Sequence, residues 1–330
     1  NGVSRYDGNR WITYNTGDGL AHSHVSTAFA SSDGSMWFGT LGGGVSRFDG
    51  KRWTTFDTRK GLSDDDVEFR ALTEDRSGVL WVGTRGGGVS RFDGDHWSTV
   101  STADGLPDSI VHAIIEDGDG NLWFGTDRGV GRFDGSTWTT LSRAEEGKPS
   151  NRVSSILADR RGDLWFGTMG NGVSRYDGEE WTVFTTDQGL PHDIVLSMME
   201  DSSGHLWFAT WGGGVGRYDG TVFQTLQKSD GLASNAVQQI IEDVNGDFWI
   251  ATEGGVTRYR PRSTAPQVRL VGIIADRSYD PSLDLELPSS QDFLRFQFEG
   301  ASMHTRPERM VYLYRLSGHE DWQQTRDLEV

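Results

Sequence analysis

The sequence lacks cysteine, long apolar runs and an excess of positive charge. With no cysteine among 330 residues, disulfide bonds and thiolate metal sites are excluded. No apolar run approaches the ~18 residues that a membrane-spanning helix needs. Asp and Glu (48) outnumber Lys and Arg (31), and the resulting net charge of −17 argues against nucleic acid or an anionic membrane surface as a partner.

Helical periodicity is also absent, and a motif of the form LWFGT followed by a glycine-rich turn recurs instead. Its tryptophans are separated by one step of 44 residues and four steps of 42. They are Trp37, Trp81, Trp123, Trp165, Trp207 and Trp249. A fixed period of this length is typical of repeat architectures such as propellers and solenoids.

Each repeat predicts four short antiparallel strands, which we name A to D. Strand A reads V-x-x-[IL], a D-x-x-G turn follows, strand B carries the tryptophan, strand C reads G-V-x-R-[FY], and strand D reads W-T-x-[FL]. Strand B is apolar on both faces, so the sheet must be covered on both sides. Radially packed four-stranded sheets of this kind form the blades of an all-β propeller.

The number of blades follows from the copies of strand C. Seven copies predict a seven-bladed ring whose first blade is incomplete, because residues 1–16 match only the second half of a repeat. The chain starts at Asn1 without a methionine, and we expect a fragment whose targeting and membrane segments lie outside it. A six-bladed ring remains the alternative, with a strand at 11–13 closing the blade of Trp249 and residues 2–7 displaced.

The composition changes at Pro261. The segment PRSTAP reads as a linker, and four alternating strands follow it outside the 42-residue period. We therefore predict a propeller at residues 1–260 and part of an immunoglobulin-like β-sandwich at 261–330, which is too short for the seven or so strands of that fold.

The repeat V-x-x-I-x-E-D-x-x-G-x-L-W-F-G-T, with its connector DGLP, resembles the two-component regulator propeller repeat. The tail PERMVYLYRLSGHEDW resembles the opening half of the three-tyrosine (Y_Y_Y) domain that follows such propellers. Its matching positions are Tyr312, Tyr314, Gly318 and Trp322.

This resemblance implies the periplasmic sensor region of a membrane-anchored bacterial protein, such as a hybrid histidine kinase or another signalling enzyme. It implies that the region senses an oligosaccharide or similar small ligand, and that the Y_Y_Y domain passes on the signal, often as a dimer. The chain has no kinase residues, so we expect no catalytic residue and no cofactor in it. A carbohydrate-active lyase or hydrolase and a protein-interaction scaffold remain alternatives.

Candidate site residues are sought where the repeats differ, since packing explains what they share. The first residue of the turn between strands B and C varies, reading Leu41, Arg85, Asp127, Met169, Trp211 and Glu253. Trp211 lies outside both tryptophan series and suits stacking on a sugar, with Arg85, Asp127, Arg128 and Glu253 as hydrogen-bonding partners. The alternative is that Trp211 only covers the mouth of the channel.

Histidines and arginines supply two further predictions. His22, His24 and His192 lie on connectors of the same face, and His192 joins the predicted ligand-binding set; no metal site is expected, because no carboxylate partner is identifiable. The arginine of strand C recurs in every repeat and is expected to pair with a repeat carboxylate such as Asp134 or Asp117.

Overall fold

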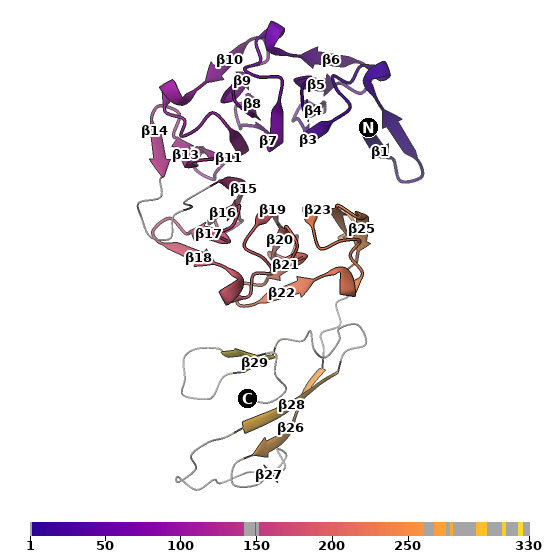
Figure 1. The fold of residues 1–330 in the computed structure, drawn as a ribbon, viewed down its shortest axis with the longest axis vertical. Coiled ribbons are helices and arrows are strands. Elements are labelled where there is room, and N and C mark those ends of the chain that lie inside the picture. The colour runs from indigo at the N-terminus through magenta and orange to yellow at the C-terminus, as the bar shows by residue number, and fades with distance from the viewer. Residues whose placement is uncertain are drawn as a thin grey trace. The chain divides into compact units, whose positions relative to one another are not determined.

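The computed structural model describes residues 2–141, 149 and 152–260, and the backbone of five strands beyond them. The chain divides into two compact units, Asn1–Tyr259 and Arg260–Val330. The first unit is built of antiparallel sheets that follow one another along the chain, which confirms the predicted all-β propeller (Figure 1).

Five of the six blades have four strands each, in the order of the chain. Blade 1 contains β3 (Val25–Ala30), β4 (Met36–Thr40), β5 (Val45–Phe48) and β6 (Trp53–Phe56). Blade 2 contains β7 (Val67–Glu74), β8 (Leu80–Thr84), β9 (Val89–Phe92) and β10 (Trp97–Val100). Blade 3 contains β11 (Val111–Glu116), β12 (Leu122–Thr126), β13 (Gly129–Phe133) and β14 (Trp138–Leu141).

The remaining blades continue the series. Blade 4 contains β15 (Val153–Ala158), β16 (Leu164–Thr168), β17 (Val173–Tyr176) and β18 (Trp181–Phe184). Blade 5 contains β19 (Val195–Glu200), β20 (Leu206–Thr210), β21 (Val215–Tyr218) and β22 (Phe223–Leu226). Blade 6 has three strands, β23 (Val237–Glu242), β24 (Phe248–Thr252) and β25 (Gly255–Tyr259). The inner strands β3, β7, β11, β15, β19 and β23 face the centre (Figure 1).

Short 3-10 helices occur in the connectors between blades. They are η1 (Thr16–Asp18), η2 (Thr58–Lys60), η3 (Thr102–Asp104), η4 (Thr186–Gln188) and η5 (Lys228–Asp230). Each ends at a glycine with positive φ, such as Gly105 at 116°, a conformation that only glycine adopts freely. In the part of the chain that the structure describes, no helix has the length and apolar character to cross a lipid bilayer.

The prediction of seven blades is wrong, and the six-bladed alternative is correct. The strand-C copy at the start of the chain forms β1 (Val3–Tyr6), which pairs with β2 (Trp11–Tyr14) in a separate two-stranded sheet. The number of strand-C copies overestimates the number of blades, because this copy has no strand-A and strand-B partners among the described residues. The alternative also placed residues 11–13 beside blade 6, whereas β2 pairs with β1.

The tryptophan of strand B is buried in the core of blades 1 to 5, as Trp165 shows, whereas Trp249 of blade 6 is half-buried. The Trp165 side chain is fully buried, and its indole N–H donates to the Asp159 carboxylate at 3.0 Å. The guanidinium of Arg175, on the neighbouring strand β17, lies 5.7 Å above the ring. The same indole–aspartate bond occurs in blades 2, 3, 5 and 6. Packing therefore explains these repeated residues.

The expected partners of the strand-C arginines need correction. Arg132 donates to Asn121 at 3.0 Å, while the Asp117 carboxylate accepts from Trp123 and Asn121. Arg175 pairs with Asp163 at 2.7 Å. In blades 3 and 4 the acceptor is thus the residue two before the tryptophan, because strand register brings that residue beside the arginine.

The second unit is described only as backbone. Its strands are β26 (Gln267–Ile274), β27 (Ser278–Tyr279), β28 (Arg295–Ala301), β29 (Tyr312–Tyr314) and β30 (Gln323–Thr325). They form one sheet in the order β27-β26-β28 and one hairpin of β29 and β30. Gly318 and Trp322 and the predicted strand at 283–287 lie outside the described residues, so the immunoglobulin-like assignment stays a prediction.

Candidate functional site

The second residue of each inner strand supplies side chains to the central channel. The residues before and after it, such as Val111 and Ala113, belong to the buried core between blades, so this position is free to vary. It carries Ser26, Glu68, His112, Ser154, Leu196 and Gln238 in blades 1 to 6. Five of these six residues line one cavity.

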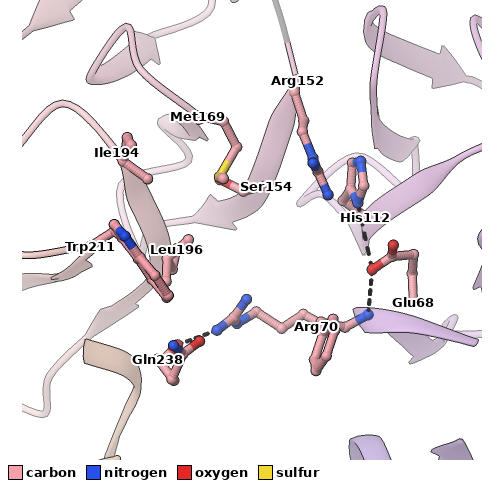
Figure 2. A pocket seen from close by; sticks show the side chains of 11 residues that line it. Glu68, Arg70, His112, Arg152, Ser154, Met169, Ile194, Leu196, Trp211 and Gln238 are labelled. Atoms are coloured by element: carbon pink, nitrogen blue, oxygen red, sulfur yellow. Dashed lines mark hydrogen bonds and ion pairs between the residues drawn. The ribbon is translucent and has the colours of Figure 1, made fainter. Parts of the chain in front are cut away.

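The cavity has a volume of about 250 Å³ and two chemically different walls (Figure 2). One wall is apolar and consists of Met169, Ile194, Leu196 and Trp211. The other is charged and consists of Glu68, His112 and Arg152, with Arg70 extended from this side towards Gln238. The Trp211 side chain is 43% exposed, so its ring is available to a ligand.

Glu68 is a buried carboxylate held by two cationic partners. It is 3% exposed, and its Oε1 lies 2.9 Å from Nε of Arg85, which is on the turn that follows β8. Its Oε2 lies 3.6 Å from Nδ1 of His112 and accepts the backbone N–H of Phe69 at 2.9 Å. Burial raises the pKa of Glu68, but the bonds from His112 and Phe69 outweigh it and leave the pKa below its ordinary value.

His112 joins Glu68 to a second carboxylate. Its Nε2 lies 2.7 Å from Oδ1 of Asp127, and Nε of Arg152 lies 3.3 Å from the same oxygen. His112 is only 4% exposed, and both ring nitrogens face carboxylates. This arrangement places both imidazole nitrogens beside carboxylates and orients charged groups around the cavity.

A wide bulge in β7 places Phe69 and Arg70 in the channel. β7 has eight residues, whereas the other five inner strands have six. The register shifts between Val67 and Leu72, and Arg70 has φ 61°, the one positive φ among the described non-glycine residues. Such a conformation costs on the order of 1–3 kcal/mol and is often associated with a functional site.

Arg70 spans the channel from blade 2 to blade 6. Its Nη2 donates to the backbone carbonyl oxygen of Gln238 on β23. Its Nε is buried and has no hydrogen-bond partner among the described residues. Burial lowers the pKa of Arg70 to about 10, so the guanidinium stays charged at neutral pH. Phe69, Arg70 and Gln238 line both the cavity and an adjoining groove of about 940 Å³ between blades 6 and 1.

Four of the predicted site residues come together here. Trp211 and Met169 line the cavity. Arg85 pairs with Glu68 of the charged wall, and Asp127 pairs with His112 of the same wall. Whether they bind a ligand stays a prediction.

The other three predicted residues lie outside the cavity lining. Arg128 pairs with Asp108 at 3.1 Å and is 79% exposed. Glu253 is exposed on the turn of blade 6. His192 accepts the backbone N–H of Ile194 through Nδ1 at 3.0 Å, which is a local turn contact.

The predicted absence of a metal is not tested by this structure, which carries no ligands. In the described ranges, no group of three His, Asp or Glu side chains is arranged to hold an ion. The rings of His22 and His24 contact each other at 5.5 Å, and neither lines the cavity.

Sequence reasoning missed Glu68, Arg70 and His112. Two signals could have found them. The single 44-residue step marks the two extra residues of β7, and the second position of strand A varies as strongly as the turn position.

Comparisons with known proteins find two family models and many similar folds. Residues 189–212 and 231–254 match the two-component regulator propeller, and residues 68–180 match the SMP-30/gluconolactonase/LRE-like region. No curated protein sequence matches the chain.

Among solved structures, the extracellular domain assigned to hybrid two-component system BT3049 of B. thetaiotaomicron is 22% identical, with a TM-score of 0.71 over 100% of this chain and 48% of that one. The extracellular domain of BT4673 from the same organism is 17% identical, with a TM-score of 0.63 over 100% of this chain and 50% of that one. The chain thus spans about half the length of these domains.

Virginiamycin B lyase from Staphylococcus aureus is also similar. It is 20% identical, with a TM-score of 0.60 over 77% of this chain and 85% of the lyase. At these identities the likeness establishes a shared fold. The family match at residues 189–212 and 231–254 adds that the chain carries two-component regulator propeller repeats. The propeller that they belong to has six blades.

Proposed function

We propose that this chain is the extracytoplasmic ligand-sensing module of a two-component signalling protein and that it binds an oligosaccharide or similar small ligand. The two-walled cavity carries this proposal, because Trp211 offers an aromatic face and the opposite wall offers fixed charged groups. Sugars are bound by this combination, with apolar ring faces on an aromatic side chain and hydroxyls on polar groups.

The volume limits what enters the cavity. At about 250 Å³ it lies just under the ~300–1,000 Å³ of typical ligand pockets. A monosaccharide-sized group suits it, and further sugar units of an oligosaccharide would lie on the surrounding turns or in the adjoining groove.

The signal path is part of the proposal. The propeller repeats and the fold shared with extracellular domains assigned to a hybrid two-component system and to a one-component system support a sensor in a membrane-anchored bacterial protein. In this proposal the C-terminal unit acts as a Y_Y_Y domain, forms a homodimer, and passes the signal to a histidine kinase through segments outside this chain.

Titration calorimetry of a panel of oligosaccharides against residues 1–330 tests the proposal. We expect one class to bind and Trp211→Ala to weaken binding at least about tenfold, in line with the loss of a stacking contact. Trp11→Ala is the matched control, since Trp11 is 63% exposed on the hairpin β1–β2 and does not line the cavity. Binding that both variants leave unchanged would contradict this site.

A lyase is the second candidate, favoured by His112 in the channel and by the fold shared with virginiamycin B lyase. A general base needs a nitrogen that reaches the substrate. Both nitrogens of His112 face carboxylates, so we expect no turnover. Product release from polysaccharides or from virginiamycin B that His112→Ala abolishes would favour the lyase.

A further inference from the structure

Arg70 is the cation of this site that has no carboxylate partner within the described residues. Glu68 is paired with Arg85 and His112, and Asp127 with His112 and Arg152. The hydrogen bond that Arg70 makes goes to a neutral carbonyl oxygen, that of Gln238.

The unpartnered Nε of Arg70 lies on the same edge of the guanidinium as one terminal nitrogen. A planar carboxylate matches two parallel N–H groups of a guanidinium, and such charge-assisted pairs are stronger than bonds to neutral acceptors. A carbonyl oxygen satisfies one donor and leaves Nε without an acceptor, whereas a carboxylate would satisfy both donors and add to the attraction that Glu68 exerts on the guanidinium charge.

The backbone supports a role in binding. The two extra residues of β7 and the left-handed conformation of Arg70 carry its side chain into the channel, where it reaches β23. A blade does not need them, because the five other inner strands pack without such an insertion.

The net charge of −17 does not exclude an anionic ligand. Interactions between exposed charges are screened over ~8 Å at physiological salt, so the groups within the cavity dominate. Arg70 and Arg152 are the cationic members of its lining, Glu68 is the anionic one, and Glu68 is neutralised by Arg85.

We propose that the ligand of this cavity is a sugar acid, and that its carboxylate binds the guanidinium of Arg70 in place of the Gln238 carbonyl oxygen while its ring lies against Trp211. This inference rests on the proposed function and specifies its ligand class. Because Nε is buried, the guanidinium turns away from β23 as the carboxylate binds.

Calorimetry with three uronates and their neutral parents tests the proposal: glucuronate, galacturonate and mannuronate against glucose, galactose and mannose. We expect at least one uronate to bind about tenfold or more tightly than its parent, the range of a charge-assisted hydrogen bond. Arg70→Gln should reduce that preference to within about twofold. Arg70→Lys should retain part of it, because an ammonium keeps the charge without the planar fork.

The control is Arg10→Gln, which removes an exposed arginine of the hairpin β1–β2, outside the cavity, and should leave the preference unchanged. Thermal unfolding of each variant checks that it is folded. If Arg70→Gln is unfolded, the uronate preference of Arg70→Lys decides the test. A 6-sulfated sugar that binds more tightly than every uronate would overturn the carboxylate assignment.

The two proposals fail differently. Neutral sugars that bind as tightly as uronates, with Trp211→Ala weakening both, would overturn the sugar acid and leave the sensor. No binding by any sugar or oligosaccharide would overturn both.

Discussion

Blades 2 and 3 contain the same inner strand with one difference. Blade 2 reads VEFRALTE from Val67 and blade 3 reads VHAIIE from Val111. Without Phe69 and Arg70, the first would read VEALTE, and each remaining residue would have a counterpart in blade 3. The packing positions are thus kept, and the insertion adds only residues that face the channel.

This comparison separates scaffold from site. Residues repeated in every blade fill the wedges between sheets, as Trp81 and Trp123 do at 4% exposure each. Several residues that break the repeat, such as Glu68, Arg70 and Trp211, lie around the cavity. Changes to the first group should alter stability, and changes to the second should alter binding.

The largest loss of stability is expected from Trp165→Ala in blade 4, whose inner strand has no insertion. Trp165 is fully buried and contacts Phe184, Phe208 and Tyr218, so the cavity left behind should cost about 3–5 kcal/mol of unfolding free energy. Urea unfolding measures it. The matched variant Trp211→Ala should stay within about 0.5 kcal/mol. Equal losses from both would show that Trp211 is also a scaffold residue.

The second effect concerns the aspartate that accepts the indole N–H. Asp75→Ala in blade 2 and Asp117→Ala in blade 3 each remove an acceptor at 2.7 Å from a tryptophan, which should cost about 1–3 kcal/mol. Asp117 also accepts from the Asn121 side chain, where blade 2 has Val79, so urea unfolding should give a loss in blade 3 at least as large as that in blade 2. A much larger loss in blade 2 would mean that its insertion strains the scaffold.

The sequence predicted the scaffold well because the pattern of strands and turns is local. The period and the tryptophan at the core of blades 1 to 5 were correct. The blade number was wrong because it depends on which strands pair, and β1 and β2 pair only with each other. The partner of Arg132 was wrong for the same reason, since register and not sequence distance brings Asn121 beside it.

The site was predicted only in part. Trp211 and Met169 were found because they vary on a turn. Glu68 and His112 were missed because candidates were sought on the turns and connectors and not on the inner strands. The hydrogen bond from Arg70 to Gln238 joins residues 168 positions apart, and nothing in a single sequence indicates that these two residues meet.

The third effect is a loss of stability in acid. Burial raises the pKa of Asp117, but the bonds from Trp123 and Asn121 outweigh it and leave the pKa below its ordinary value of 3.8; Asp201 behaves in the same way. The folded state therefore binds these protons less readily than the unfolded state. Their stabilisation is complete above pH of about 5 and is lost as the pH falls through the folded pKa.

Urea midpoints measured from pH 7 to pH 3 check this expectation. Asp117→Asn cannot ionise, so its midpoint should fall less steeply with acid than that of the wild type. An unchanged slope would assign the acid sensitivity to other carboxylates.

The smallest effect on stability is expected from deleting Phe69 and Arg70. The resulting VEALTE keeps Val67, Ala71 and Leu72 for the core. Removing a left-handed non-glycine residue should stabilise the chain by about 1–2 kcal/mol, offset by the lost contact between Arg85 and the Phe69 ring at 5.8 Å. We expect a net change within about 1 kcal/mol by urea unfolding, together with loss of uronate binding by calorimetry.

The control deletes two residues of the same strand in blade 3. Ala113 and Ile114 are both 3% exposed, so their removal should prevent the blade from packing. If deleting Phe69 and Arg70 instead cost about 3 kcal/mol or more, the insertion would be holding β7 against β23 and the distinction between the two blades would fail. A folded deletion variant that still prefers uronates would place the carboxylate on Arg152, the other cation of the cavity lining.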